Sequence, residues 1–125
     1  MNCADEELRL RYACEGDYEI VFNQYYGDVK SSEYLSREVH EDVSKTIDIL
    51  SKLSVQGSLE GLGKSIMVVA RIKDNKPIGL ITLVAGDSTV ELHIGILKNE
   101  RRKGLASKSL GLAEKYCIDK KWRKR

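Results

Sequence analysis

A short basic segment near position 100 carries residue types that bind phosphate groups. It spans residues 99–106 and joins a strand-like pattern to a helix-like pattern. The first amides of a helix have no partner within the helix, and the macrodipole adds positive charge there, so anions bind at such a terminus. Gly104 allows close backbone approach, and Arg101, Arg102 and Lys103 supply charge for a pyrophosphate. The segment predicts a site for a phosphorylated ligand.

Two common phosphate-binding motifs do not fit this chain. A dinucleotide fold requires Gly-x-Gly-x-x-Gly after an early strand, and the segment contains one glycine. A P-loop requires a glycine, four residues and then Gly-Lys-Ser/Thr. Residues 63–65 supply the second part, but Ser58 occupies the place of the first glycine, and the tripeptide precedes a strand where it should open a helix. The pattern Arg-x-x-Gly-x-Ala remains.

Hydrophobic periodicity predicts the elements that must position this segment. Alternating apolar residues predict strands at Leu8–Tyr12, Ile66–Ile72, Pro77–Ala85 and Val90–Leu97. Helical spacing predicts helices at 16–26, 39–53 and 105–119. Short turns at 73–76 and 86–88 make the last three strands an antiparallel meander, and the glycine-containing stretch 54–65 is expected to be a loop. The predicted order is β-α-α-β-β-β-α.

The segment Arg101–Ala106 resembles the acetyl-CoA signature of the GNAT superfamily of N-acetyltransferases, Gln/Arg-x-x-Gly-x-Gly/Ala. The string Val90–Leu97 before it is similar to the ribosomal-protein N-terminal acetyltransferase branch. The resemblance implies a GNAT-like α/β (α+β) fold, with a mostly antiparallel central sheet and helices on both faces, that uses acetyl-CoA. It also implies that the chain covers about the N-terminal two thirds of that fold, without the strand, helix and further strands that follow in relatives.

The same resemblance assigns the cofactor site. The backbone N–H groups of Ile94, Gly95 and Ile96 would bind the pantetheine arm and the acetyl carbonyl. The phosphates would be held by the basic turn and the first helical turn, comprising Arg101, Arg102, Lys103, Gly104, Leu105, Ala106 and Ser107.

Glu91 is the candidate general base, because it occupies the position of the carboxylate in the family's Ala-Glu-Ile-Gly-like string. His93 lies two residues further along the strand and therefore on the same face. A carboxylate and an imidazole together can pass a proton from an ammonium through water. The alternatives are that Glu91 pairs with a nearby cation and that His93 is a half-buried imidazole with its hydrogen bonds satisfied.

The general acid has no clear candidate. Many family members supply a tyrosine from a helix that this chain lacks, and Tyr116 falls in a different helix. Tyr25, Tyr26 and Tyr34 are expected to pack or to contact the acceptor, since their region lines the amine site in relatives. Direct attack in a ternary complex needs no nucleophilic cysteine, so Cys117 is expected in the core.

Composition indicates one domain over residues 1–125. The chain is 42% hydrophobic and 32% charged, as in globular proteins. Its three widely spaced cysteines indicate free thiols and no metal site. Acidic residues at positions 5–7 stand where a secretory signal would be apolar, and no long apolar run follows. We expect a cytoplasmic protein with no membrane contact.

The charge is unevenly distributed. Residues 1–62 carry 13 acidic and 6 basic side chains, whereas residues 63–125 carry 6 acidic and 15 basic ones. The acidic half suits a cationic acceptor, and the basic residues gather in 98–108 and in the tail 120–125. That tail is interpreted as a solvated terminus, with nucleic-acid contact as the alternative.

The sequence supports two candidate functions. The first is an acetyl-CoA-dependent N-acetyltransferase acting on a primary amine of a protein N-terminus, a peptide or a small molecule. The second is a catalytically inactive CoA-binding or protein-interaction remnant of the same fold. In either case, the expected open edge at Val90–Leu97 predicts a homodimer or other self-association.

Overall fold

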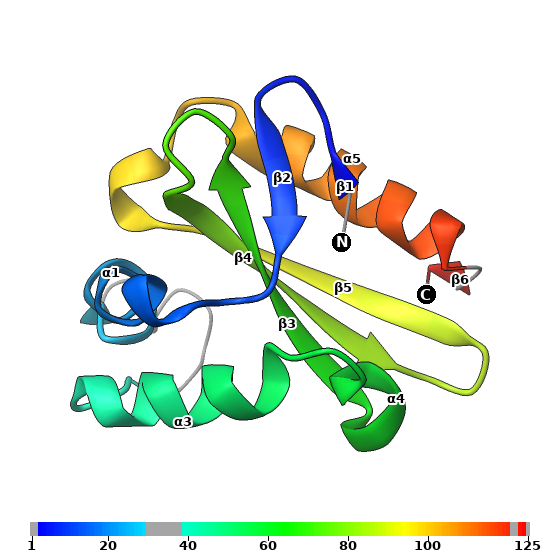
Figure 1. The fold of residues 1–125 in the computed structure, drawn as a ribbon, viewed down its shortest axis with the longest axis horizontal. Coiled ribbons are helices and arrows are strands. Elements are labelled where there is room, and N and C mark those ends of the chain that lie inside the picture. Colours follow the sequence, from blue (N-terminus) through cyan, green and yellow to red (C-terminus); the bar gives the residue numbers. More distant parts are fainter. Residues whose placement is uncertain (1–2, 30–38, 121–122, 125) are drawn as a thin grey trace.

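The computed structural model describes residues 3–29, 39–120 and 123–124. A six-stranded sheet runs through the centre in the order β1-β2-β3-β4-β5-β6 (Figure 1). The strands are β1 (Cys3–Ala4), β2 (Leu8–Arg11), β3 (Lys64–Arg71), β4 (Pro77–Ala85), β5 (Thr89–Ile96) and β6 (Arg123–Lys124). All neighbours pair antiparallel except β5 and β6, which pair parallel.

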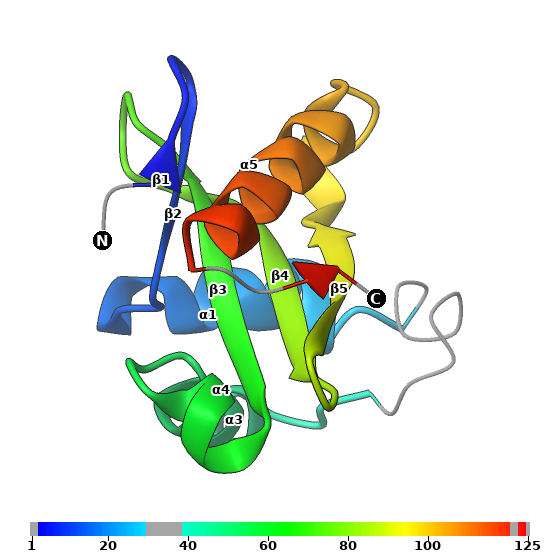
Figure 2. The same cartoon turned by 90° about the vertical axis from the view of Figure 1, so that its right-hand side faces the viewer.

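Helices cover both faces of the sheet (Figures 1 and 2). One face carries α5 (Leu105–Asp119), and the other carries α1 (Tyr18–Val21), the π-helix η2 (Phe22–Tyr26) and α3 (Val43–Leu53). Three short helices lie in connections: η1 (Glu15–Asp17), α4 (Ser58–Leu62) and η3 (Lys98–Glu100).

Two apolar clusters join these layers through the central strand β3. Met67 and Val69 pack toward α5, whereas Ile66 and Val68 pack toward α1 and α3. Each fully buried aliphatic side chain of this size stabilises the fold by about 1.5–3 kcal/mol. The α5 helix contributes buried side chains at helical spacing: Leu105, Ser109, Leu112, Ala113, Tyr116 and Cys117. Cys117 thus lies in the core, as predicted.

The predicted fold class is confirmed, and β4 and α5 have the predicted ends. The second predicted helix starts at Val43 and not at residue 39, because the Asp42 side chain caps it by accepting a hydrogen bond from the Ser44 amide at 2.8 Å. The predicted loop at 54–65 contains α4, which is bounded by Gly57 and Gly63 at φ 85° and 74°. Those glycines mark the ends of a helix and not a mobile loop.

Several smaller expectations need correction. The edge of β5 was predicted to be open. It is partly covered, because Arg123 and Lys124 form the short strand β6 and pair with Thr89 and Val90. His40, expected on the surface, is buried, stacks on Tyr26 with ring centroids 4.6 Å apart, and has Thr46 Oγ1 2.8 Å from its Nδ1. Tyr34 and three residues of the basic tail, Lys121, Trp122 and Arg125, lie outside the described residues.

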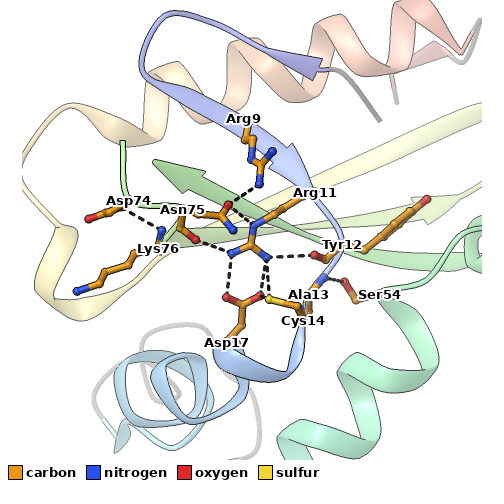
Figure 3. Close-up of polar contacts among 10 residues, drawn as sticks. All are labelled: Arg9, Arg11, Tyr12, Ala13, Cys14, Asp17, Ser54, Asp74, Asn75 and Lys76. Atoms are coloured by element: carbon orange, nitrogen blue, oxygen red, sulfur yellow. Dashed lines mark hydrogen bonds and ion pairs between the residues drawn. The ribbon is translucent and has the colours of Figure 1, made fainter. Parts of the chain in front are cut away.

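The Arg11 guanidinium ties three parts of the chain together (Figure 3). Its Nη1 and Nη2 donate to the two carboxylate oxygens of Asp17 at 2.6 and 2.9 Å. Its Nε and Nη2 donate to the side-chain and backbone oxygens of Asn75 at 2.9 and 2.8 Å, and Nη1 also donates to the Tyr12 carbonyl at 3.1 Å. All five N–H donors of the guanidinium are therefore used.

The ion pair within this contact is largely buried, since the side chains of Arg11 and Asp17 are 13% and 3% exposed. Burial disfavours the charged form of Asp17, but hydrogen bonds from Arg11 and from the Cys14 amide outweigh it and hold the pKa of the carboxyl below its ordinary value. A lowered folded-state pKa adds stability above the unfolded pKa of about 3.9, and this stability is lost as pH falls through the folded value.

We expect Asp17→Asn to lower the free energy of unfolding at neutral pH by about 3 kcal/mol, because it leaves the buried Arg11 without its counter-charge. Urea denaturation measures this change, and Asp48→Asn on the exposed side of α3 serves as the matched control. Below about pH 4 the wild-type protein should lose stability more steeply than Asp17→Asn. Parallel acid profiles for the two proteins would contradict the role of this carboxylate.

Candidate functional site

The turn between β5 and α5 leaves the first amides of α5 open. Arg102 and Gly104 have left-handed backbone angles, with φ 66° and 72°. Gly104 is the N-cap residue of α5, and no side chain caps the helix there. A Cβ built on Gly104 would meet no atom within 4 Å. The helix terminus therefore faces open space, with its N–H groups available to an anion.

The cationic side chains of this turn are exposed, and two of them contact neighbouring groups of the protein. Arg101, Arg102 and Lys103 all lie at the surface. Arg101 Nε donates to the Ile96 carbonyl at 3.0 Å, and Lys103 Nζ lies 3.2 Å from Glu100 Oε1. The same Glu100 oxygen accepts a hydrogen bond of 2.7 Å from an arginine of β3. The turn is thus tied to the end of β5 and to β3 while its charge remains accessible.

The outer edge of β5 offers two of the three predicted backbone donors. The Leu97 N–H donates to the Ile78 carbonyl at 2.9 Å and so points toward β4. Because N–H directions alternate along an antiparallel strand, the Gly95 N–H also points toward β4, whereas those of Ile94 and Ile96 point to the outer edge. Within the described residues, β6 pairs only with the first two residues of β5. The outward amides of Ile94 and Ile96 therefore face an open edge.

Glu91 and His93 lie together on the face of β5 that also carries α1 and α3. Glu91 Oε1 and His93 Nε2 are 3.5 Å apart, and the side chains are 42% and 59% exposed. The predicted shared face is therefore confirmed, whereas the alternative of a half-buried His93 is wrong. A carboxylate and an imidazole at this separation, both open to solvent, can pass a proton directly between them or to neighbouring solvent.

Sequence reasoning missed the contact between Tyr25 and Gly95. An ideal Cβ on Gly95 would lie 2.2 Å from Tyr25 Oη and 2.3 Å from Tyr25 Cζ, so the hydroxyl end of the ring rests directly on this residue. A single glycine inside a strand pattern often marks such a close approach, and this signal was present in the sequence. Tyr25 thereby joins Glu91 and His93 on one face of β5.

The π-helix η2 sets the direction of Tyr25. The Gly27 N–H donates to the Phe22 carbonyl at 2.7 Å, five residues back, and a Cβ on Gly27 would lie 2.7 Å from the Phe22 ring. η2 also contacts the turn between β5 and α5, because the Asn99 N–H donates to Gln24 Oε1 at 3.2 Å. An ion pair of 3.7 Å between Asp28 and Lys98 adds a second link. π-Helical turns frequently occur at functional sites.

Tyr116 lies far from this site. It is eleven residues beyond the first residue of α5, or about 16 Å along the helix. It lines a cavity of about 310 Å³ beside α4, and burial, followed by the neighbouring Tyr12, raises its pKa. Among the residues the structure describes, no three His, Cys, Asp or Glu side chains gather as a metal site would require. No helix within those residues has the length and apolarity needed to cross a membrane.

We expect Gly95→Ala to destabilise the protein by about 1–3 kcal/mol, because the added methyl group overlaps the Tyr25 ring. In a Tyr25→Ala background the same substitution should cost less than about 0.5 kcal/mol, and a double-mutant cycle in urea measures the difference. Gly111→Ala, on the open side of α5, is the control and should be neutral or stabilising. An equal cost of Gly95→Ala in both backgrounds would contradict the contact.

Comparisons with known proteins bear on the family and the fold of this chain. The sequence model of the acetyltransferase (GNAT) family matches residues 27–124. No curated protein sequence matches the chain. The structure is similar to an acetyltransferase (GNAT family) from Bacillus anthracis, with TM-score 0.76 and 23% identity over 94% of this chain and 66% of that one.

Two other solved structures share the fold. One is spermidine N-acetyltransferase from Vibrio cholerae in complex with CoA and spermine, with TM-score 0.71 and 21% identity over 90% of this chain and 64% of that one. The other is the microcin C7 self-immunity acetyltransferase in complex with acetyl-CoA and AMP, with TM-score 0.70 and 11% identity over 95% and 67%. The chain thus spans about two thirds of the length of these proteins. By its match over residues 27–124, it belongs to the acetyltransferase (GNAT) family.

Proposed function

We propose that this chain binds acetyl-CoA and transfers the acetyl group to a primary amine by direct attack in a ternary complex. Membership of the acetyltransferase (GNAT) family supports the reaction class. The complexes of two structural neighbours, one with CoA and one with acetyl-CoA, support the cofactor. The observation that carries the proposal is the uncapped, cation-flanked N-terminus of α5 next to the open edge of β5.

In this proposal, the diphosphate of CoA binds at the start of α5. Gly104 leaves room for it, and the exposed Arg101, Arg102 and Lys103 offset its charge. The backbone groups that hold it belong to Gly104, Leu105, Ala106 and Ser107. The outward amides of Ile94 and Ile96 hold the pantetheine arm. Gly95, whose N–H points toward β4, contributes by making room for Tyr25.

Glu91 and His93 take up the proton of the attacking amine. Bound acetyl-CoA supplies a thioester carbonyl carbon that is open to attack. Outward N–H groups of β5 at the carbonyl oxygen stabilise the charge that develops there. Glu91 accepts the amine proton, directly or through water shared with His93, and both groups have the solvent access that this role requires.

The proposal also concerns the identity of the amine acceptor. The string Val90–Leu97 supports a protein N-terminus, by its similarity to the ribosomal-protein branch. The fold likeness to a spermidine N-acetyltransferase, together with the acidic first half of the chain, supports a small cationic amine.

Self-association belongs to the same proposal. The outer edge of β5 beyond Val90 presents backbone groups that a second copy of the chain can pair with. The spermidine N-acetyltransferase from Vibrio cholerae is dodecameric, which supports assembly as a feature of such folds. Sedimentation velocity over a range of protein concentrations measures it, and a monomer at every concentration would contradict it.

We expect Gly104→Glu to weaken CoA binding more than tenfold, because it fills the cradle and adds a negative charge where the diphosphate binds. Isothermal titration calorimetry with CoA measures the affinity. Gly111→Glu, which places the same charge elsewhere on α5, is the matched control and should bind like the wild type. Arg102→Ala combined with Lys103→Ala should weaken binding without changing Gly104. Unchanged affinity in both test variants would contradict the site.

We expect Glu91→Gln to lower kcat about a hundredfold while leaving the affinity for CoA unchanged, since the base acts only in the chemical step. A thiol-release assay across a panel of amines measures turnover. Asp87→Asn in the turn before β5 is the control. Wild-type activity in Glu91→Gln would remove this carboxylate from the mechanism. CoA binding by the wild type without thiol release for any amine would favour the catalytically inactive, CoA-binding alternative.

A further inference from the structure

Acyl transfer from a thioester requires a proton for the departing sulfur, and the roles assigned above leave that donor open. The structure assigns it to Tyr25 of the π-helix η2, whose hydroxyl acts as the general acid on the face of β5; this assignment rests on the proposed function. It places the acid in the N-terminal part of the fold, beside the strand that binds the acyl group.

The position of the Tyr25 hydroxyl carries the inference. Tyr25 Oη lies over Gly95, close enough that even a methyl group on that residue would overlap it. Gly95 stands between Ile94 and Ile96, the two residues whose amides face the open edge of β5. The phenol is therefore next to the stretch of strand that offers backbone donors, on the same face as Glu91 and His93.

The surrounding contacts hold Tyr25 in place. Its ring meets Tyr26 edge-on, with centroids 5.0 Å apart and planes at 73°. Tyr26 is itself fixed in the core by stacking on His40. The hydrogen bond from Asn99 to Gln24 joins η2 directly to the start of the turn before α5. A donor fixed in this way loses little entropy on reaching its working position, which is the condition for efficient proton transfer.

Tyr116, Tyr18 and Cys14, three other proton donors in the described residues, are placed elsewhere. Tyr116 is buried and lies beside Tyr12, near the C-terminal end of α5. Tyr18 lines a groove between α1 and α3. Cys14 donates to Asp17 within the Arg11 contact. Glu91 and His93 have the opposite task, since they take up the amine proton.

The step balances with these groups and solvent. The C–N bond forms between the amine nitrogen and the acetyl carbon, and the C–S bond breaks with its electron pair passing to sulfur. Tyr25 gives its Oη proton to that sulfur, so CoA leaves as the thiol. The proton lost by the amine nitrogen passes to Glu91 or His93 and from there to solvent, and solvent returns a proton to Tyr25. The net change is one amine and one thioester converted to one amide and one thiol.

Tyr25→Phe tests the assignment, since it removes the hydroxyl and keeps the ring on Gly95. We expect kcat with acetyl-CoA to fall about a hundredfold, with KM within about twofold of the wild type. Tyr26→Phe is the matched control: it removes a hydroxyl from the adjacent residue and should leave kcat within about twofold. Urea denaturation should show all three proteins equally folded.

A second measurement needs binding but no turnover. The ultraviolet absorbance of the thiolate reports the pKa of the CoA thiol when CoA is bound to the protein. A hydroxyl that donates to the sulfur stabilises the thiolate, so this pKa should be about one unit lower in the wild type than in Tyr25→Phe. The control Tyr26→Phe should match the wild type.

The outcomes separate the two proposals. A wild-type protein that does not bind CoA overturns the proposed function, and the assignment of Tyr25 with it. A wild-type protein that binds CoA, with Tyr25→Phe matching it in the thiol titration and in any turnover, overturns the assignment of Tyr25 alone. A loss in Tyr25→Phe that Tyr26→Phe does not share supports Tyr25 as the acid.

Discussion

The contact of the Arg11 guanidinium with Asp17 and Asn75 is the interaction on which the candidate site depends. It joins the end of β2, the helix η1 and the turn between β3 and β4, three segments that are far apart in the sequence. Every donor of the guanidinium is used, and the pair of Arg11 and Asp17 is largely buried, so the contact tolerates little displacement. Because η1 leads directly into α1 and η2, this contact fixes where the N-terminal helices lie on the sheet, and with them the position of Tyr25.

A second constraint links those helices to the turn that precedes α5. Tyr25 rests on Gly95 of β5, and Gln24 and Asp28 contact the first residues of η3. The proposed acyl-binding edge, the proposed proton donor and the proposed phosphate cradle are therefore held by one connected set of contacts. Displacement of η2 therefore disturbs all three. For this reason a substitution at Gly95 is expected to change the stability of the fold as well as the activity.

The sequence predicted the regular elements well because their signals are local. Strand β4 and helix α5 have the predicted ends, since Pro77 starts one and Gly104 precedes the other. The shared face of Glu91 and His93 followed from the two-residue period of a strand. The π-helix was not predictable because apolar spacing does not separate one π-helical turn from an α-helix. The burial of His40 and the pairing of β6 were not predictable because each depends on packing against another segment of the chain. The contact of Tyr25 with Gly95 was partly predictable, because a glycine inside a strand often marks a close approach.

Membership of the acetyltransferase (GNAT) family is shown by the match over residues 27–124, whereas activity rests on the geometry of this chain. Binding of the CoA diphosphate at the open N-terminus of α5 is the part of the proposal on which the other roles depend. A crystal structure of the protein grown with CoA would test it. We expect diphosphate oxygens about 3 Å from backbone nitrogens within Gly104–Ser107, beside Arg102. A diphosphate bound elsewhere, with this helix terminus contacting only solvent, would contradict it.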